Sequence, residues 1–252
     1  MDQATITILL FLCGLLIGSF LTVVAYRLPR GESVVGGRSR CPACGAQIAA
    51  YDNVPVLSWL LLRGRARCCR APISPRYPLT ELAAGALYAA TALVLWGDAG
   101  EIALGLAFVT MLLAVTLTDL ERRIIPNRIL LVGAIVGLGL AAATDLGSLP
   151  ERVIAVAAAG GLLFLIALAY PRGMGLGDVK LAAVMGLYLG RSVAPALLIA
   201  FAAGSLVGLA MIARHGAAAR KRAVPFGPFL ALGGVIGLLA GNQMVDWYLG
   251  TF

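Results

Sequence analysis

The stretch TITILLFLCGLLIGSFLTVVAY, residues 5–26, carries no charged side chain and is long enough to cross the roughly 30 Å hydrocarbon core of a bilayer as a helix. The residues before it include Asp2 rather than a basic cluster, and positive charge follows it. A removable signal peptide has a shorter apolar region with positive charge in front. We therefore expect this stretch to be a membrane-spanning helix that stays in the protein.

Further long apolar blocks with few charged residues follow along the chain. Of its 252 residues, 60% are hydrophobic and only 13% are charged, whereas soluble domains carry about a quarter charged residues. This composition predicts an all-α membrane protein with about eight transmembrane helices and one cytoplasmic loop domain. Small residues allow helices to approach closely, and we expect this at Gly18, Gly137, Gly161, Gly204 and Gly208. The seven later apolar blocks are 80–96, 102–119, 129–143, 152–170, 179–190, 193–213 and 227–249.

The basic residues predict the orientation of these helices. The net charge of +8 would suit nucleic-acid binding, but in a membrane protein basic loops fix the topology. Alternate connections, together with the span ends that adjoin them, hold 18 of the 20 Lys and Arg residues, and only Arg152 and Arg191 fall on the other side. We therefore expect these basic connections in the cytoplasm, both termini outside, and membrane lipid rather than nucleic acid as a partner. The Arg220-Lys221-Arg222 run is expected to contact lipid headgroups.

This topology predicts three regions along the chain. Residues 1–26 form the first transmembrane helix, and residues 27–79 form the only sizeable loop, which contains a cysteine knuckle. Residues 80–252 form a seven-helix membrane region.

Two aspartates lie at the boundaries of predicted spans on the cytoplasmic side. Asp119 ends the third span and Asp178 opens the sixth, after the glycine-rich run Gly173-Met174-Gly175-Leu176-Gly177. An ionisable group at the edge of a membrane is expensive unless it is paired or hydrated, so it indicates function. The alternatives are an ordinary boundary residue at Asp119 and a helix N-cap at Asp178. A carboxylate-coupled transporter is a further alternative, although transporters place such acids near the midplane.

If the third and sixth helices are neighbours, the two carboxyl groups meet. Two carboxyl groups in contact cannot both ionise cheaply, so one holds a proton while the other stays charged. Peptide hydrolysis needs this division, because the carboxylate draws a proton from water and the acid polarises the scissile carbonyl. The glycines would let an extended substrate backbone approach.

The 27–79 loop contains Cys41-Pro42-Ala43-Cys44 and the adjacent pair Cys68-Cys69. Two cysteine pairs predict a structural zinc site, and disulfides are not expected in the cytoplasm. Adjacent cysteines are poor joint ligands for one metal, so a degenerate knuckle without metal is the alternative. Outside this loop, Cys13 is expected to pack within the first span, and His215 to be solvated.

The chain as a whole resembles the prepilin peptidase family, also called type IV prepilin leader peptidases. The first-helix stretch GSFLTVVAYRLP (18–29), the knuckle, the segment PISPRYPLTE (72–81), Asp119 and the stretch GLGDVK (175–180) are similar to the motifs of that family. The resemblance implies a bacterial inner-membrane aspartyl endopeptidase of the Gly-x-Gly-Asp type with Asp119 and Asp178 as its catalytic pair. It also implies substrate contacts at Gly175, Gly177 and Lys180.

The same resemblance implies the substrates and the cofactors. Family substrates are type IV prepilins and the pseudopilins of type II secretion, which are cut after Gly on the cytoplasmic side. Many members then methylate the new N-terminus with S-adenosylmethionine. A methyltransferase-only relative is therefore a further alternative.

Two positions depart from the family pattern. Thr22 stands where Asn is usual, and Ala66 stands where the third loop cysteine would align. The zinc ligands would then be Cys41, Cys44 and Cys69, with Cys68 or water in the fourth position. We therefore predict weak zinc binding or none, and stronger binding in the variant Ala66→Cys.

Overall fold

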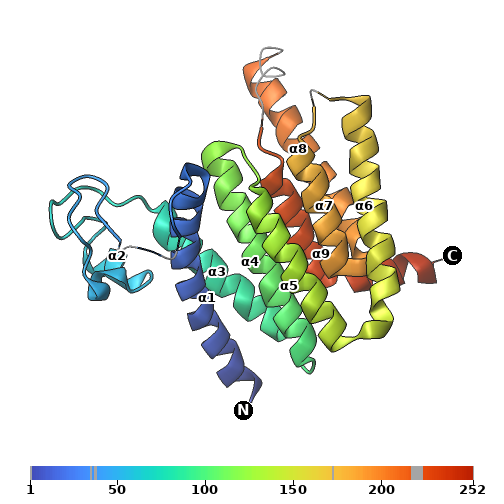
Figure 1. Cartoon of the computed structure of the whole chain (residues 1–252), viewed down its shortest axis with the longest axis horizontal. Coiled ribbons are helices and arrows are strands. Elements are labelled where there is room, and N and C mark those ends of the chain that lie inside the picture. The colour runs from blue at the N-terminus through green and yellow to red at the C-terminus, as the bar shows by residue number, and fades with distance from the viewer. Residues whose placement is uncertain (1, 35, 37–38, 172, 217–223, 252) are drawn as a thin grey trace. The chain divides into compact units, whose positions relative to one another are not determined.

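The computed structural model describes residues 2–34, 36, 39–171, 173–216 and 224–251 (Figure 1). The Arg220-Lys221-Arg222 run and the side chain of His215 lie outside the described residues. Within these ranges the chain is helical, and two isolated bridges are the only β-type pairings. The predicted all-α class is therefore confirmed.

Among the described residues, eight long helices correspond one to one to the eight predicted spans. A short helix, α2 (Leu57–Leu61), lies between the first two. The long helices are α1 (Gln3–Arg27), α3 (Arg76–Val94), α4 (Ala99–Arg122), α5 (Asn127–Thr144), α6 (Leu149–Ala169), α7 (Leu176–Leu189), α8 (Val193–His215) and α9 (Gly227–Gly250).

By length and composition, the described residues contain six stretches able to cross a membrane. Helices α7 and α8 count together as Leu176–Arg214, because the 3-10 turn η4 (Gly190–Ser192) continues one into the other. Helix α3 is not among the six, since its first turns contain Tyr77, Thr80 and Glu81.

The chain divides into two compact units, 1–94 and 95–252. In the first unit, α1 packs on α3. A Cβ at Gly14 would lie 2.7 Å from the carbonyl oxygen of Ala84, and one at Gly18 would lie 2.8 Å from Cα of Glu81. The expected close approach at Gly18 is therefore confirmed. The same expectation is wrong at Gly161 and Gly208, where an added Cβ would meet nothing within 4 Å.

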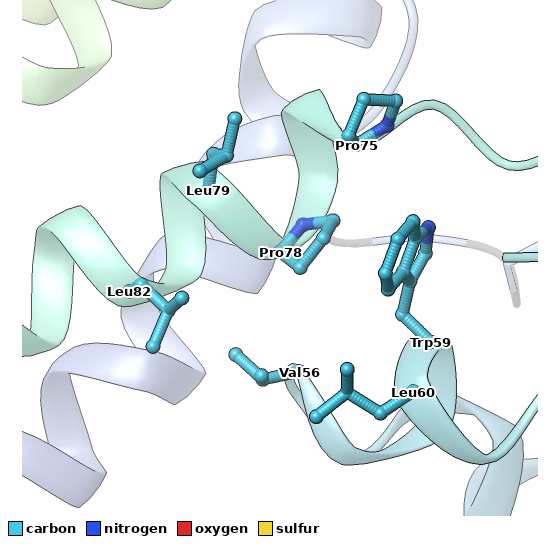
Figure 2. Close-up of a pocket in the computed structure, with 7 residues that line it drawn as sticks. All are labelled: Val56, Trp59, Leu60, Pro75, Pro78, Leu79 and Leu82. Carbon is cyan, nitrogen blue, oxygen red and sulfur yellow. The ribbon is translucent and has the colours of Figure 1, made fainter. Parts of the chain in front are cut away.

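The loop of the first unit folds onto the start of α3. The indole N–H of Trp59 donates to the Ile73 carbonyl at 3.0 Å, and the Val56 N–H donates to the buried Glu81 carboxylate at 2.7 Å. Between α2 and α3 these contacts leave an apolar pocket of about 270 Å³ (Figure 2). Its lining is Val56, Trp59, Leu60, Pro75, Pro78, Leu79 and Leu82.

In the second unit, α4 and α7 both lie in the core. Helix α4 packs on α5 and α9, and α7 packs on α6, α5 and α9. The ring of Phe108 on α4 stacks on Tyr188 of α7 with centroids 4.9 Å apart, and the Tyr188 hydroxyl donates to the Gly133 carbonyl at 2.7 Å. Because successive helices alternate in direction, the end of α4 and the starts of α5, α7 and α9 lie at one end of this unit (Figure 1).

The opposite end of the second unit is held by arginines. The buried Arg152 donates to the carbonyls of Leu187 and Tyr188 at 3.1 and 2.7 Å. It also forms an ion pair with Glu101 at 3.1 Å. Arg191 pairs with Asp246 at 3.0 Å. Arg152 and Arg191, the two basic residues outside the predicted cytoplasmic connections, thus both form ion pairs.

Candidate active site

Asp119 lies within the last turn of α4, which runs one turn beyond the predicted end of the span. The helix ends where Arg123 takes a left-handed conformation with φ 55°, and its N–H donates to the Asp119 carbonyl at 2.8 Å. The preceding Thr118 is fully buried, and Asp119 itself is only 5% exposed. Asp119 is therefore not an ordinary solvated boundary residue.

Asp178 lies in the first turn of α7. The helix begins at Leu176, so Gly175 rather than Asp178 holds the N-cap position, and the predicted start at 179 is three residues late. The Asp178 carboxylate accepts a hydrogen bond from the Gly175 N–H at 3.3 Å. This contact fixes the start of α7 and orients the carboxyl group.

The glycines before Asp178 fit closely against their own chain. A Cβ at Gly177 would lie 3.1 Å from Cβ of Ile125, and Gly173 lies against the ring of Tyr170. A Cβ at Gly175 would lie 3.3 Å from the Asp178 carboxylate. These glycines thus have a packing role, and their role in substrate binding stays a prediction.

Lys180 connects the start of α7 to that of α5. Its ammonium group donates to the side-chain oxygen of Asn127 at 3.0 Å, and the lysine is exposed. The same end of the unit therefore presents one exposed positive charge close in sequence to Asp178.

The structure brings the two aspartates together. Helix α4 contacts α7, and the two carboxyl groups are close enough for the charge of Asp119 to act on Asp178. Neither carboxyl group forms an ion pair with another described residue. The condition that the third and sixth helices are neighbours is therefore met, and the acids lie at helix ends rather than mid-helix.

A third helix also reaches Asp119, which the sequence reasoning missed. The Gly227 N–H, at the start of α9, donates to the Asp119 carboxylate at 2.9 Å. The available signal was the Gly-Pro pair at 227–228, since Pro favours the first turn of a helix. That signal predicts a helix start, but it does not predict which side chain the helix meets.

The four loop cysteines form one cluster, with all their sulfur atoms within 4.8 Å of one another. Cys41 Sγ lies 3.7 Å from Cys69 Sγ, and Cys44 Sγ lies 3.3 Å from Cys68 Sγ. Four sulfurs around zinc lie about 3.8 Å apart, because Zn–S bonds are about 2.3 Å long. Cys68 and Cys69 therefore both reach the cluster, although they are adjacent in the sequence.

The two halves of this cluster are built alike. The Cys41 N–H donates to the Ala46 carbonyl, and the Ala66 N–H donates to the Ala71 carbonyl, both at 2.8 Å. Ala66 therefore occupies the place of Cys41 in the second knuckle, as the alignment implied. The left-handed Arg70, with φ 59°, takes the place of Gly45.

The thiols of the cluster differ in acidity. Backbone N–H groups of Ala43 and Cys44 lower the pKa of Cys41 to about 7. The hydrogen bond with Cys44, followed by burial, raises the pKa of Cys68 to about 12. Because a metal binds thiolates, these thiols would have to lose their protons when one binds.

A helical membrane protein with two acids at one end of its bundle and a cysteine knuckle in a loop has the features of a membrane aspartic peptidase. Residues 12–95 match the Bacterial Peptidase A24 N-terminal domain, and residues 106–212 match the Type IV leader peptidase family. The chain belongs to this peptidase family, so the predicted family and enzyme class are confirmed.

Similar proteins carry the name prepilin leader peptidase/N-methyltransferase. The one from Aeromonas hydrophila is 36% identical over 97% of this chain and 94% of its own length. The Bacillus subtilis protein is 35% identical over 96% of this chain and 97% of its own length. A protein from Burkholderia pseudomallei is 38% identical over 91% of this chain and 84% of its own length. No solved structure matches the chain.

Proposed function

We propose that this protein is an aspartic endopeptidase that removes the leader from type IV prepilins or pseudopilins, cutting after Gly on the cytoplasmic side. The observation that carries the proposal is the meeting of Asp119 and Asp178, from α4 and α7, at one end of the second unit. The names of the relatives support the substrate class.

In the proposed reaction the two carboxyl groups share one proton. The charged carboxylate takes a proton from water, whose oxygen attacks the scissile carbonyl carbon, while the protonated carboxyl donates to the carbonyl oxygen. The tetrahedral intermediate then breaks its C–N bond as a proton passes to the leaving amine. We assign Gly175, Gly177 and Lys180, which lie within three residues of Asp178 in the sequence, to substrate binding.

We propose that this chemistry takes place at the cytoplasmic face of the bacterial inner membrane, and the basic loops support this side. In this proposal the 27–79 loop and residues 120–128 lie on the cytoplasmic side. We also propose the division of the chain into a first transmembrane helix (1–26), the loop domain (27–79) and the membrane peptidase region (80–252). Labelling of Cys41 or Cys44 by a membrane-impermeant thiol reagent in intact spheroplasts would contradict this orientation.

A second activity, N-methylation of the new N-terminus, is favoured by the names of the relatives. S-adenosylmethionine would supply the methyl group. The pocket between α2 and α3 does not fit that molecule, because its lining is entirely apolar and offers nothing to the charged amino-acid end (Figure 2). The methyl donor therefore binds elsewhere if this activity is present.

Product mass tests both activities. The purified protein in detergent, incubated with a prepilin, should release a product lighter by the leader, and addition of S-adenosylmethionine should add one methyl group. Methylation of a pilin whose leader has already been removed, without cleavage of the prepilin, would support a methyltransferase-only relative. Ion transport in vesicles without cleavage would support a transporter.

We further propose that Cys41, Cys44, Cys68 and Cys69 hold a structural zinc ion, with Cys68 supplying the thiol that Ala66 lacks. The mutual approach of all four sulfurs supports this assignment over a three-thiol site. Zinc would tie the two knuckles together and hold the loop.

Zinc stoichiometry after dialysis against a mild chelator tests this assignment. We expect about one zinc per wild-type chain, loss of zinc in Cys68→Ser, and its return in the double variant Ala66→Cys/Cys68→Ser. Because the thiols must lose their protons to bind zinc, the zinc should be released as the pH is lowered. Wild-type protein without zinc would favour the degenerate knuckle.

A further inference from the structure

The start of α9 has a single backbone donor that its own helix does not use. Pro228 has no N–H, and the N–H groups of Phe229 and Leu230 both donate to the Phe226 carbonyl, at 3.0 and 3.1 Å. Phe226, at the N-cap position, offers no side-chain acceptor. Helices normally need such a cap. The Gly227 N–H is capped instead by Asp119, from a residue 108 positions earlier in the chain.

The contact is also steric. A Cβ at Gly227 would lie 2.7 Å from Oδ2, 3.2 Å from Cγ and 3.3 Å from Cβ of Asp119. The Asp119 side chain therefore packs flat against the glycine, and only a residue without a side chain leaves it this position. Gly227 itself is buried.

The position of Gly227 is fixed in turn by aromatic packing. The ring of Phe226 lies 5.5 Å from that of Phe201 on α8 and 6.2 Å from that of Phe229 on α9. The placement of Asp119 thus depends on the α8–α9 hairpin as well as on α4. Both residues of that hydrogen bond lie within the second unit.

The contact uses only one of the two carboxylate oxygens. Oδ2 accepts from Gly227, whereas no described residue donates to Oδ1. One oxygen is thus held by the backbone, and the other is left for a water molecule or for the second carboxyl group.

We propose that Gly227 is a positioning residue for the Asp119 carboxyl group, acting through its N–H and through its missing side chain. This inference rests on the proposed peptidase function. It adds a third helix to a site that the aspartate motifs of α4 and α7 do not indicate.

The test is the steady-state kinetics of prepilin cleavage by Gly227→Ala in the full-length protein. Since misplacement of a reacting group by about 1 Å can cost about 100-fold, we expect kcat to fall about 100-fold. KM should stay within about threefold, because the substrate contacts remain. A purely structural role would change the folded fraction but would not lower kcat per folded molecule.

The chain offers matched controls on glycine. At Gly241, near the other end of α9, a Cβ would lie 2.6 Å from Cβ of Ser192, so Gly241→Ala introduces a similar overlap far from Asp119. Gly208→Ala on α8 meets open space. Both controls should keep kcat within about threefold of wild type, even where Gly241→Ala lowers the melting temperature.

If Gly227→Ala does not fold, Phe201→Leu provides a milder displacement of the same helix start. It should lower kcat by roughly tenfold or less, with KM unchanged. A kcat for Gly227→Ala or, in its place, Phe201→Leu that equals the Gly241→Ala value would overturn the positioning role. Absence of cleavage by the wild-type protein would instead refute the proposed function.

Discussion

Charged groups lie near both ends of helices α4 and α7, and the two ends are built differently. At one end Arg152 pairs with Glu101 of α4 and donates to the last carbonyls of α7, while Arg191 pairs with Asp246. At the other end lie Asp119 and Asp178, whose carboxylates accept hydrogen bonds from the backbone N–H groups of Gly227 and Gly175, respectively.

This difference separates a structural role from a chemical one. A buried ion that is paired and hydrogen-bonded can be tolerated in a fold, and removing its partner is costly. Two neighbouring acids that form no close ion pair with a described residue do not stabilise the bundle in this way. They are expected where a reaction needs one charged and one protonated carboxyl group.

The largest effect is expected at the acid end. Asp119→Asn or Asp178→Asn should each lower the rate of prepilin cleavage by about 10³-fold, because each removes one of the two proton-transfer groups. The melting temperature should not fall, since an Asn oxygen at 119 still accepts from Gly227. Near-normal cleavage by either folded variant would remove the basis for the acid pair.

An intermediate effect, on stability rather than chemistry, is expected at the arginine end. Arg152→Ala leaves the buried carbonyls of Leu187 and Tyr188 without their donor, which should cost about 3 kcal/mol. For a domain of this size, the melting temperature should fall by roughly 6 to 12 °C. Cleavage per folded molecule at low temperature should change little. An unchanged melting temperature would show that Arg152 does not hold the two helices.

The smallest effect is expected at the exposed pair. The side chains of Arg191 and Asp246 are 47% and 61% exposed, so Arg191→Ala should cost less than about 1 kcal/mol. Thermal melts of Arg191→Ala and Asp246→Ala at low and high salt provide the comparison. A loss equal to that of Arg152→Ala would mean that burial does not distinguish the two arginines.

The sequence predicts the features that depend on local pattern. Blocks of helical length with almost no charge predicted the long helices, and the positions of Asp119 and Asp178 at span boundaries predicted the acid pair. The boundaries were less accurate, because α4 ends at the left-handed Arg123 and α7 begins at a Gly N-cap. Neither of these helix ends changes the hydrophobic pattern from which the spans were predicted.

The contacts that the sequence did not predict are long-range or depend on unusual backbone. Gly227 lies 108 residues from Asp119, and Arg152 reaches carbonyls 35 and 36 residues away. Cys68 joins the cysteine cluster in a knuckle where Arg70 adopts a conformation that usually requires glycine. Spacing alone could not show that two adjacent cysteines reach one cluster.

The most direct test of the acid pair compares the cleavage rates of Asp119→Asn, Asp178→Asn and the double variant, measured as product mass over long incubations. Residues that act as one unit are strongly non-additive. We therefore predict that the double variant cleaves within about threefold of the slower single variant. A double variant slower by the product of the two single losses, about 10⁶-fold below wild type, would show that the two carboxyl groups act independently.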